Sequence, residues 1–324
     1  MRRRVYVEHL PPDELGRAET VKLCATYGLE PIVALPPSRE TPAMQAALRA
    51  LDRGGLRVGV WPLLEDDEGY WPSAHNAASF ERRVSQALAF TKAAGVSVRT
   101  VAIDLEPPLE ELRGLLEGSG RSRFDYVRQR RRRALGGVDV FTRVAEQLGA
   151  EGIETIAAAI PLVVIDPAGV FWDHVLATPV AQVPWSVVSP MMYTTLARDV
   201  LRRRSEASVR ALLYAGADRL RRAVGPRASV SVGLVGQGKL GTERVYGGPS
   251  ELARDVGAVR AAGIDDLALF ALEGVLDRNA PEVWLEAFVR AGPDRPDFLR
   301  RAWADGVLSA ARVVTAVGGL ATKR

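Results

Sequence analysis

Eight short runs of β-forming residues recur along the chain, and most are followed by a stretch with helical periodicity. This alternation is typical of repeated βα units on a parallel sheet. The predicted strands are Arg4–Glu8, Pro31–Leu35, Arg57–Trp61, Thr100–Leu105, Thr155–Ile160, Ser186–Tyr193, Ser229–Leu234 and Asp266–Leu272. Eight units are the number that closes a (β/α)8 barrel, whereas an open doubly wound sheet usually has fewer strands. The sequence therefore predicts an α/β fold of the TIM-barrel type.

Helical periodicity fills the stretches between these strands. The predicted helices are Asp13–Tyr27, Met44–Asp52, Ala78–Ala94, Ser205–Val224 and Ser250–Ala262. Several end near a glycine, which readily adopts the left-handed backbone of a helix C-terminus: Gly28, Gly54, Gly95, Gly225 and Gly263. The fourth connection, Pro107–Gly152, is the longest, so we expect a barrel whose fourth βα connection is extended by further helices.

Chain length and composition fit one such barrel. TIM barrels typically run to about 250 residues, and the chain has 324. We therefore expect a barrel domain over 1–292 and a C-terminal helical extension over 293–324 that packs outside it. Apolar residues at 47% and charged residues at 25% match globular usage and exclude a disordered or fibrous chain. The apolar segment 306–320 is shorter than the roughly 20 residues that span a bilayer, which favours a docked helix over a membrane anchor.

Charge and cysteine content exclude several classes of protein. The single Cys24 cannot form an internal disulfide, and the 3 histidines form no cluster at zinc spacing, so we expect no metal and no cofactor. A net charge of +4 from 43 basic and 39 acidic residues requires no nucleic-acid partner, and the arginine-rich run 128–133 is interpreted as a solvated helix face. Arg2, Arg3 and Arg4 precede polar residues rather than an apolar run, which predicts no secretion signal and a cytoplasmic location.

The fourth predicted strand carries the clearest candidate chemistry. Its odd positions from 101 to 105 are branched and apolar, which predicts that this face packs against the helices. The alternate positions hold Ala102, Asp104 and Glu106, so two carboxylates are predicted to point into the barrel mouth about 6.7 Å apart along the strand. Burial raises the pKa of such a group and suits it to general acid catalysis. The alternative is that these carboxylates cap a helix or pair with arginine.

Three short motifs at predicted strand ends resemble the family 18 glycoside hydrolases, which are chitinase-like TIM barrels: Asp104-Leu105-Glu106, Ala159-Ile160-Pro161 and Met191-Met192-Tyr193. The strand-four signature of that family is D-x-x-D-x-D-x-E. The resemblance implies that Glu106 is the acid that protonates the leaving oxygen. It implies that Asp104 orients the N-acetyl group of the substrate, whose own oxygen is the nucleophile, and that Tyr193 donates a hydrogen bond near the reacting sugar.

The sequence departs from that signature and leaves a second catalytic scheme open. Arg99 and Ala102 stand where the signature has its first two aspartates. Glu273 is predicted to end strand eight, on the same inward side as Leu269 and Ala271. With Glu106, it would make an ordinary pair of acid and nucleophile or of acid and base. The alternative for Glu273 is a helix cap.

Further residues are predicted to bind substrate at the same end of the barrel. Trp61 and Trp71 offer flat aromatic faces that stack against sugar rings. Glu8 ends strand one and adds a third carboxylate to the mouth. Met191, in the strand-six motif, and Gln237 complete the predicted set. Gln237 lies in a G-x-G-x-x-G match over 236–241, which we interpret as a rim loop rather than a nucleotide site.

These features together predict an enzyme that hydrolyses a glycosidic bond, with Glu106 as general acid and Asp104 assisting. The expected partner is a carbohydrate ligand. Two alternatives remain: a chitinase-like carbohydrate-binding protein without turnover, and a TIM-barrel isomerase or lyase acting on a sugar or sugar phosphate.

Overall fold

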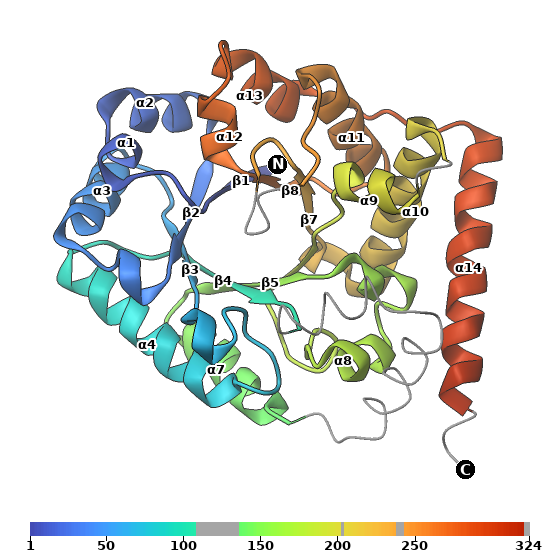
Figure 1. Cartoon of the computed structure of the whole chain (residues 1–324), viewed down its shortest axis with the longest axis horizontal. Coiled ribbons are helices and arrows are strands. Elements are labelled where there is room, and N and C mark those ends of the chain that lie inside the picture. Colours follow the sequence, from blue (N-terminus) through green and yellow to red (C-terminus); the bar gives the residue numbers. More distant parts are fainter. Residues whose placement is uncertain (108–135, 202–203, 238–242, 321–324) are drawn as a thin grey trace.

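Eight parallel strands form the centre of the computed structural model, which describes residues 1–107, 136–201, 204–237 and 243–320 (Figure 1). The strands are β1 Arg2–Val7, β2 Glu30–Leu35, β3 Gly59–Pro62, β4 Thr100–Leu105, β5 Glu154–Ala159, β6 Val187–Pro190, β7 Val230–Gly233 and β8 Asp266–Phe270. Their order is β6-β5-β4-β3-β2-β1-β8-β7. Strands β6 and β7 approach through the isolated parallel bridges Val188↔Ala228 and Met191↔Ser231. The barrel is therefore nearly closed, and the predicted (β/α)8 fold is confirmed.

Helices surround the strands on every side that Figure 1 displays. They are α1 Pro12–Leu15, α2 Ala18–Tyr27, α3 Pro42–Arg53, α4 Ala77–Ala93, α7 Val138–Ala150, α8 Phe171–Leu176, α9 Thr194–Val200, α10 Glu206–Val224, α11 Pro249–Ala261, α12 Leu272–Leu276, α13 Pro281–Arg290 and α14 Phe298–Leu320. Short 3-10 turns lie at η1 Pro37–Arg39, η2 Asp66–Glu68, η3 Pro161–Ile165 and η4 Gly225–Arg227. The last helix, α14, packs beside α10 on the outside of the barrel (Figure 1). None of the described helices is both long enough and apolar enough to cross a membrane.

Three predicted elements differ from the structure. The helix predicted over Asp13–Tyr27 is two helices, because the chain is extended at Arg17 (φ −65°, ψ 139°) between α1 and α2. Strand β6 ends at Pro190 rather than at Tyr193, because the chain turns there: the Met192 amide donates to the Pro190 carbonyl at 3.0 Å. Strand β8 ends at Phe270, and the following residues turn into α12. Residues 108–135 of the fourth connection, with the arginine-rich run 128–133, lie outside the described residues.

Alternate residues of each strand divide the apolar interior into two cores, as the period of two in a strand requires. The outer core lies between strands and helices and includes Val101, Ile103 and Leu105 of β4. The inner core fills the barrel and includes Ala102 of β4 together with Trp61 of β3. The prediction that Ala102 faces the interior of the barrel is thus confirmed. Asp104 has the same parity on β4 and lies nearer the mouth.

The N-terminal end of the barrel is closed by ion pairs. Arg4 is only 1% exposed, and its guanidinium pairs with Asp266 of β8 and with Glu154 of β5 at 2.7 Å. Arg2 pairs with Glu154 and with Glu30, each at 2.5 Å. These side chains come from the first residues of four strands, so they seal that end and leave the opposite end for ligands.

We expect Arg4→Ala to lower the free energy of unfolding by about 3 kcal/mol, because it removes a buried guanidinium and leaves Asp266 without its cation. Arg57→Ala is the matched control, since the Arg57 side chain is 54% exposed and lies 3.5 Å from Glu30. It should cost less than about 1 kcal/mol. Urea denaturation of the two variants measures both values. Equal effects would show that the buried pair does not support the barrel.

Candidate active site at the barrel mouth

Asp104 and Glu106 lie where β4 ends at the C-terminal end of the barrel. Asp104 is 5% exposed, and Glu106 is half-buried. Each carboxyl group affects the pKa of the other, which places the two side chains close together. Burial, with a smaller contribution from the Glu8 charge, raises the pKa of Glu106 to about 7. Burial and the neighbouring Glu106 raise the pKa of Asp104 well above its ordinary range. The pair is thus an acid that holds protons near neutral pH.

Glu8 follows the end of β1 and is 4% exposed. The Tyr70 hydroxyl donates a 3.1 Å hydrogen bond to its Oε1. The charge of Glu8 contributes to the raised pKa values of Asp104, Glu106 and Tyr193. The structure therefore brings this third predicted carboxylate into the electrostatic environment of the strand-four pair.

Glu273 reaches the mouth from a helix rather than from a strand. The prediction that it ends strand eight is wrong, because β8 ends at Phe270 and Glu273 lies in the first turn of α12. Its Oε1 accepts hydrogen bonds from the backbone amides of Glu8 at 3.1 Å and His9 at 2.9 Å. An acidic side chain is favoured in a helix first turn by the helix dipole. One oxygen of Glu273 thus holds the turn that follows β1.

Arg39 holds the same turn from its carbonyl side. Its guanidinium donates to the carbonyl oxygens of Glu8 and Leu10, the latter at 2.6 Å. Burial lowers the pKa of Arg39, while the charges of Glu273 and Glu8 act in the opposite direction. Because both the amides and the carbonyls of this turn are hydrogen-bonded, the Glu8 carboxylate has a fixed position.

Four aromatic rings line the inside of the barrel below the carboxylates, and we call them the aromatic belt: Trp61, Tyr6, Phe270 and Tyr193. Adjacent ring centroids lie 5.4 Å apart for Tyr6 and Trp61, 6.2 Å for Tyr6 and Phe270, and 5.9 Å for Tyr193 and Phe270. These spacings are those of edge-to-face and tilted aromatic pairs. The belt gives the mouth an apolar floor.

Tyr193 is held in this belt by neighbours on both sides. Burial and nearby negative charge raise the pKa of its phenol well above the ordinary range, so the hydroxyl stays neutral and able to donate. Gly233, the last residue of β7, leaves room for the ring, since a Cβ there would lie 3.1 Å from Tyr193 Cδ1. The site thus contains a phenol donor facing its carboxylates.

A buried hydrogen-bond network fixes the chain directly after Tyr193. Thr194 donates to the carboxylate of Asp255 on α11, which is 2% exposed. The same carboxylate accepts from the Tyr246 hydroxyl at 2.8 Å and from Arg210 Nε at 3.1 Å. A fully hydrogen-bonded buried carboxylate of this kind is rigid. The network therefore sets the direction in which Tyr193 enters the mouth.

The three remaining predicted residues are Trp71, Met191 and Gln237. Trp71 is 7% exposed and packs edge-on against Tyr70, with ring centroids 5.4 Å apart. Met191 bonds through its backbone amide to Ala159 at 2.8 Å. Gln237 is exposed and lines a rim cavity of about 560 Å³ together with Glu273. Residues 238–242 of the glycine-rich match lie outside the described residues.

Three buried polar atoms of the mouth have no hydrogen-bond partner among the described residues: Trp61 Nε1, Asp104 Oδ1 and Glu273 Oε2. A buried polar atom normally finds a partner, so each of these is a candidate contact for a ligand. One donor and two carboxyl oxygens suit a polyhydroxyl molecule. Within the same part of the chain, no group of three or more His, Cys, Asp or Glu side chains could hold a metal ion.

Sequence reasoning missed several members of this site. Tyr6 and Phe270 occupy inward positions of β1 and β8, and the period of two could have identified both. Arg39 lies in the short turn η1, which carries no motif. Asp255 lies 61 residues after its partner Thr194, so no local pattern points to it.

Comparison with solved structures places the chain among TIM barrels. The glycoside hydrolase domain of PgaB (BpsB) from Bordetella bronchiseptica is similar at a TM-score of 0.55, with 11% sequence identity over 89% of this chain and 99% of that one. The catalytic domain of a family GH18 chitinase from the fern Peteris ryukyuensis has a TM-score of 0.49, with 14% identity over 91% of this chain and 100% of that one. At these identities the likeness shows the fold alone. No protein-family model and no curated protein matches the chain.

The raised pKa of Glu106 predicts a stabilising substitution. Because this pKa rises from 4.5 to about 7 on folding, the folded state binds more protons between these values, and its stability falls as pH rises through them. Glu106→Gln removes the buried charge, so the free energy of unfolding at pH 8 should increase by about 1–3 kcal/mol.

At pH 4 the same substitution should have little effect, because the glutamate is then protonated in both states. Glu146→Gln, on the exposed face of α7, is the control and should change nothing at either pH. Denaturant titrations at the two pH values measure these differences. A loss of stability in the Glu106 variant at pH 8 would contradict the assigned environment.

Proposed function

We propose that this protein is a glycoside hydrolase that cleaves its substrate at the barrel mouth, with Glu106 as general acid. The observation that carries the proposal is the pair of neighbouring carboxyl groups at the end of β4, Asp104 and Glu106, with a Glu106 pKa of about 7. An acid with such a pKa is protonated in a useful fraction at neutral pH and still transfers its proton readily. The unpartnered polar atoms beside it support a ligand rich in hydroxyl groups.

In the proposed mechanism, Glu106 donates its proton to the glycosidic oxygen as the bond to the anomeric carbon breaks. Asp104 hydrogen-bonds the substrate's 2-acetamido group, whose carbonyl oxygen attacks the anomeric carbon. The resulting carboxylate of Glu106 then accepts a proton from the water that opens the cyclic intermediate. Tyr193 donates a hydrogen bond to the reacting sugar. This is the substrate-assisted scheme of the family 18 enzymes that the sequence motifs resemble.

The alternative scheme uses Glu273 as a second catalytic carboxylate. Its Oε1 accepts two backbone hydrogen bonds, at 3.1 and 2.9 Å, from the turn after β1. Hydrogen bonds of this kind stabilise the carboxylate and reduce its nucleophilicity, and they restrain its movement. These contacts favour a positioning role for Glu273 and the substrate-assisted scheme for the reaction.

We further propose that Trp61 and Trp71, which are 3% and 7% exposed, meet the substrate through their edges, Trp61 through its unpartnered Nε1. The rim cavity that Gln237 lines, of about 560 Å³, has room for an additional sugar unit beyond the reacting one. We therefore expect an oligosaccharide to be turned over faster than a single sugar attached to a small leaving group.

Substitution of the acid tests the proposal. Glu106→Gln should lower turnover of an aryl glycoside by about 10²-fold or more, because general acid catalysis contributes roughly 10²–10⁴-fold. Turnover of the unmodified protein should fall as pH rises through about 7, when Glu106 loses its proton. Glu146→Gln should retain full activity. Unchanged turnover in the Glu106 variant would remove this residue from the acid role.

A panel of aryl glycosides with and without a 2-acetamido group separates the two schemes. Substrate assistance predicts hydrolysis of the acetamido sugars only, a large loss of turnover in Asp104→Asn, and retained turnover in Glu273→Gln. Hydrolysis of plain glucosides with Glu273 required would favour the two-carboxylate scheme instead. Binding of oligosaccharides without hydrolysis of any panel member would indicate a carbohydrate-binding protein.

A further inference from the structure

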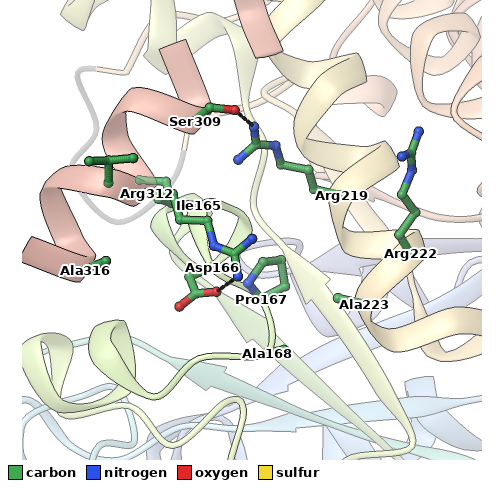
Figure 2. Close-up of a pocket in the computed structure, with 11 residues that line it drawn as sticks. Ile165, Asp166, Pro167, Ala168, Arg219, Arg222, Ala223, Ser309, Arg312 and Ala316 are labelled. Atoms are coloured by element: carbon green, nitrogen blue, oxygen red, sulfur yellow. Dashed lines mark hydrogen bonds and ion pairs between the residues drawn. The ribbon is translucent and has the colours of Figure 1, made fainter. Parts of the chain in front are cut away.

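A second cavity lies on the outside of the barrel, away from the proposed active site. It has a volume of about 630 Å³ and is bounded by the segment after β5, by α10 and by α14. Figure 2 shows these three walls with their side chains. Ile165, Pro167 and Val313 contribute apolar surface. Arg219 of α10 points toward Ser309, and Arg312 of α14 points toward Asp166. The cavity thus combines apolar walls with cationic groups.

Of the three arginines that line this cavity, Arg219 alone forms no ion pair with a described carboxylate. Arg312 pairs with Asp166 at 3.2 Å. Arg219 donates to the Asp305 carbonyl at 3.1 Å and to the Ser309 hydroxyl at 2.7 Å, both through one nitrogen, and forms no ion pair with any described carboxylate. Burial lowers the pKa of Arg219, the charge of Asp305 acts in the opposite direction, and the charge of Arg312 lowers it. A negative group between these two arginines would offset both effects.

Arg222 also lines the cavity but differs from the other two arginines. It forms an ion pair with Asp218 at 2.7 Å, one turn earlier on α10. Its side chain is 73% exposed, and in Figure 2 it extends away from Arg219 and Arg312. Arg222 therefore provides an internal control, since it is a cation of the same wall that extends away from the other two arginines.

We propose that this cavity is a binding site for a small amphipathic anion, whose carboxylate or phosphate lies between Arg219 and Arg312 and whose apolar part packs on Ile165 and Val313. A volume of about 630 Å³ falls within the range of ligand sites and exceeds what an inorganic anion fills. Arginine forms paired hydrogen bonds with carboxylates and phosphates. The site uses none of the residues of the barrel mouth, so it stands or fails independently of the proposed hydrolase activity.

Calorimetric titration of the full chain with decyl phosphate and decanoate, below their micelle concentrations, tests this site. Both should bind. Inorganic phosphate lacks the apolar chain and decanol lacks the anionic group, so each should bind at least about tenfold more weakly. Arg219→Gln and Arg312→Gln should each weaken binding of decyl phosphate about tenfold or more, because each removes a charge-assisted contact. Arg222→Gln should bind like the unmodified protein.

The source of the anion is distinguished by vesicles of phosphatidylcholine with and without phosphatidic acid. Sedimentation with the acidic vesicles that depends on Arg219 identifies a bilayer lipid, and absence of sedimentation together with binding of decyl phosphate identifies a free amphiphile. Failure of decyl phosphate and decanoate to bind would overturn the proposal. Equal binding by the Arg219, Arg312 and Arg222 variants would overturn it as well.

Discussion

Two neighbouring carboxyl groups at the end of one strand, Asp104 buried and Glu106 half-buried, are the constraint around which the barrel mouth is arranged. Side chains alternate along β4, so Asp104 shares the parity of the inward Ala102, and Glu106 follows directly after the strand. Burial raises the pKa of both groups, so the pair holds a proton near neutral pH. Holding that proton near neutral pH is a property of the fold, and it is also the property that acid catalysis needs.

The two ends of the barrel differ in whether their carboxylates are paired with cations. At the N-terminal end, Arg4 and Arg2 neutralise carboxylates of three other strands. At the mouth, the described residues place Asp104, Glu106 and Glu8 near one another, and Arg39 is engaged with backbone carbonyls. The N-terminal end thus gains stability from charge pairing, whereas the mouth keeps charge unneutralised and reactive. This division is typical of the TIM-barrel architecture.

The sequence predicted the parts of the site that follow from local periodicity. The strand-four carboxylates could be placed because six consecutive residues alternate without interruption. Glu273 was misplaced because the apolar run continues through Leu272 although the strand ends at Phe270. Glu273 and Arg39 hydrogen-bond the turn after β1, and Asp255 contacts the residue after Tyr193. These contacts join residues that are distant in the sequence. Such contacts depend on barrel closure, which no local pattern encodes.

The ionisation of Glu106 is the most direct test of this account. Carboxyl carbons of selectively ¹³C-labelled glutamate, assigned by comparison with Glu106→Gln, can be followed by NMR as the pH is raised. We predict a Glu106 resonance that titrates with a midpoint near 7 and that responds to titration of Asp104. A midpoint near 4.5, the ordinary value for a glutamate, would contradict the desolvated pair and the acid role that depends on it.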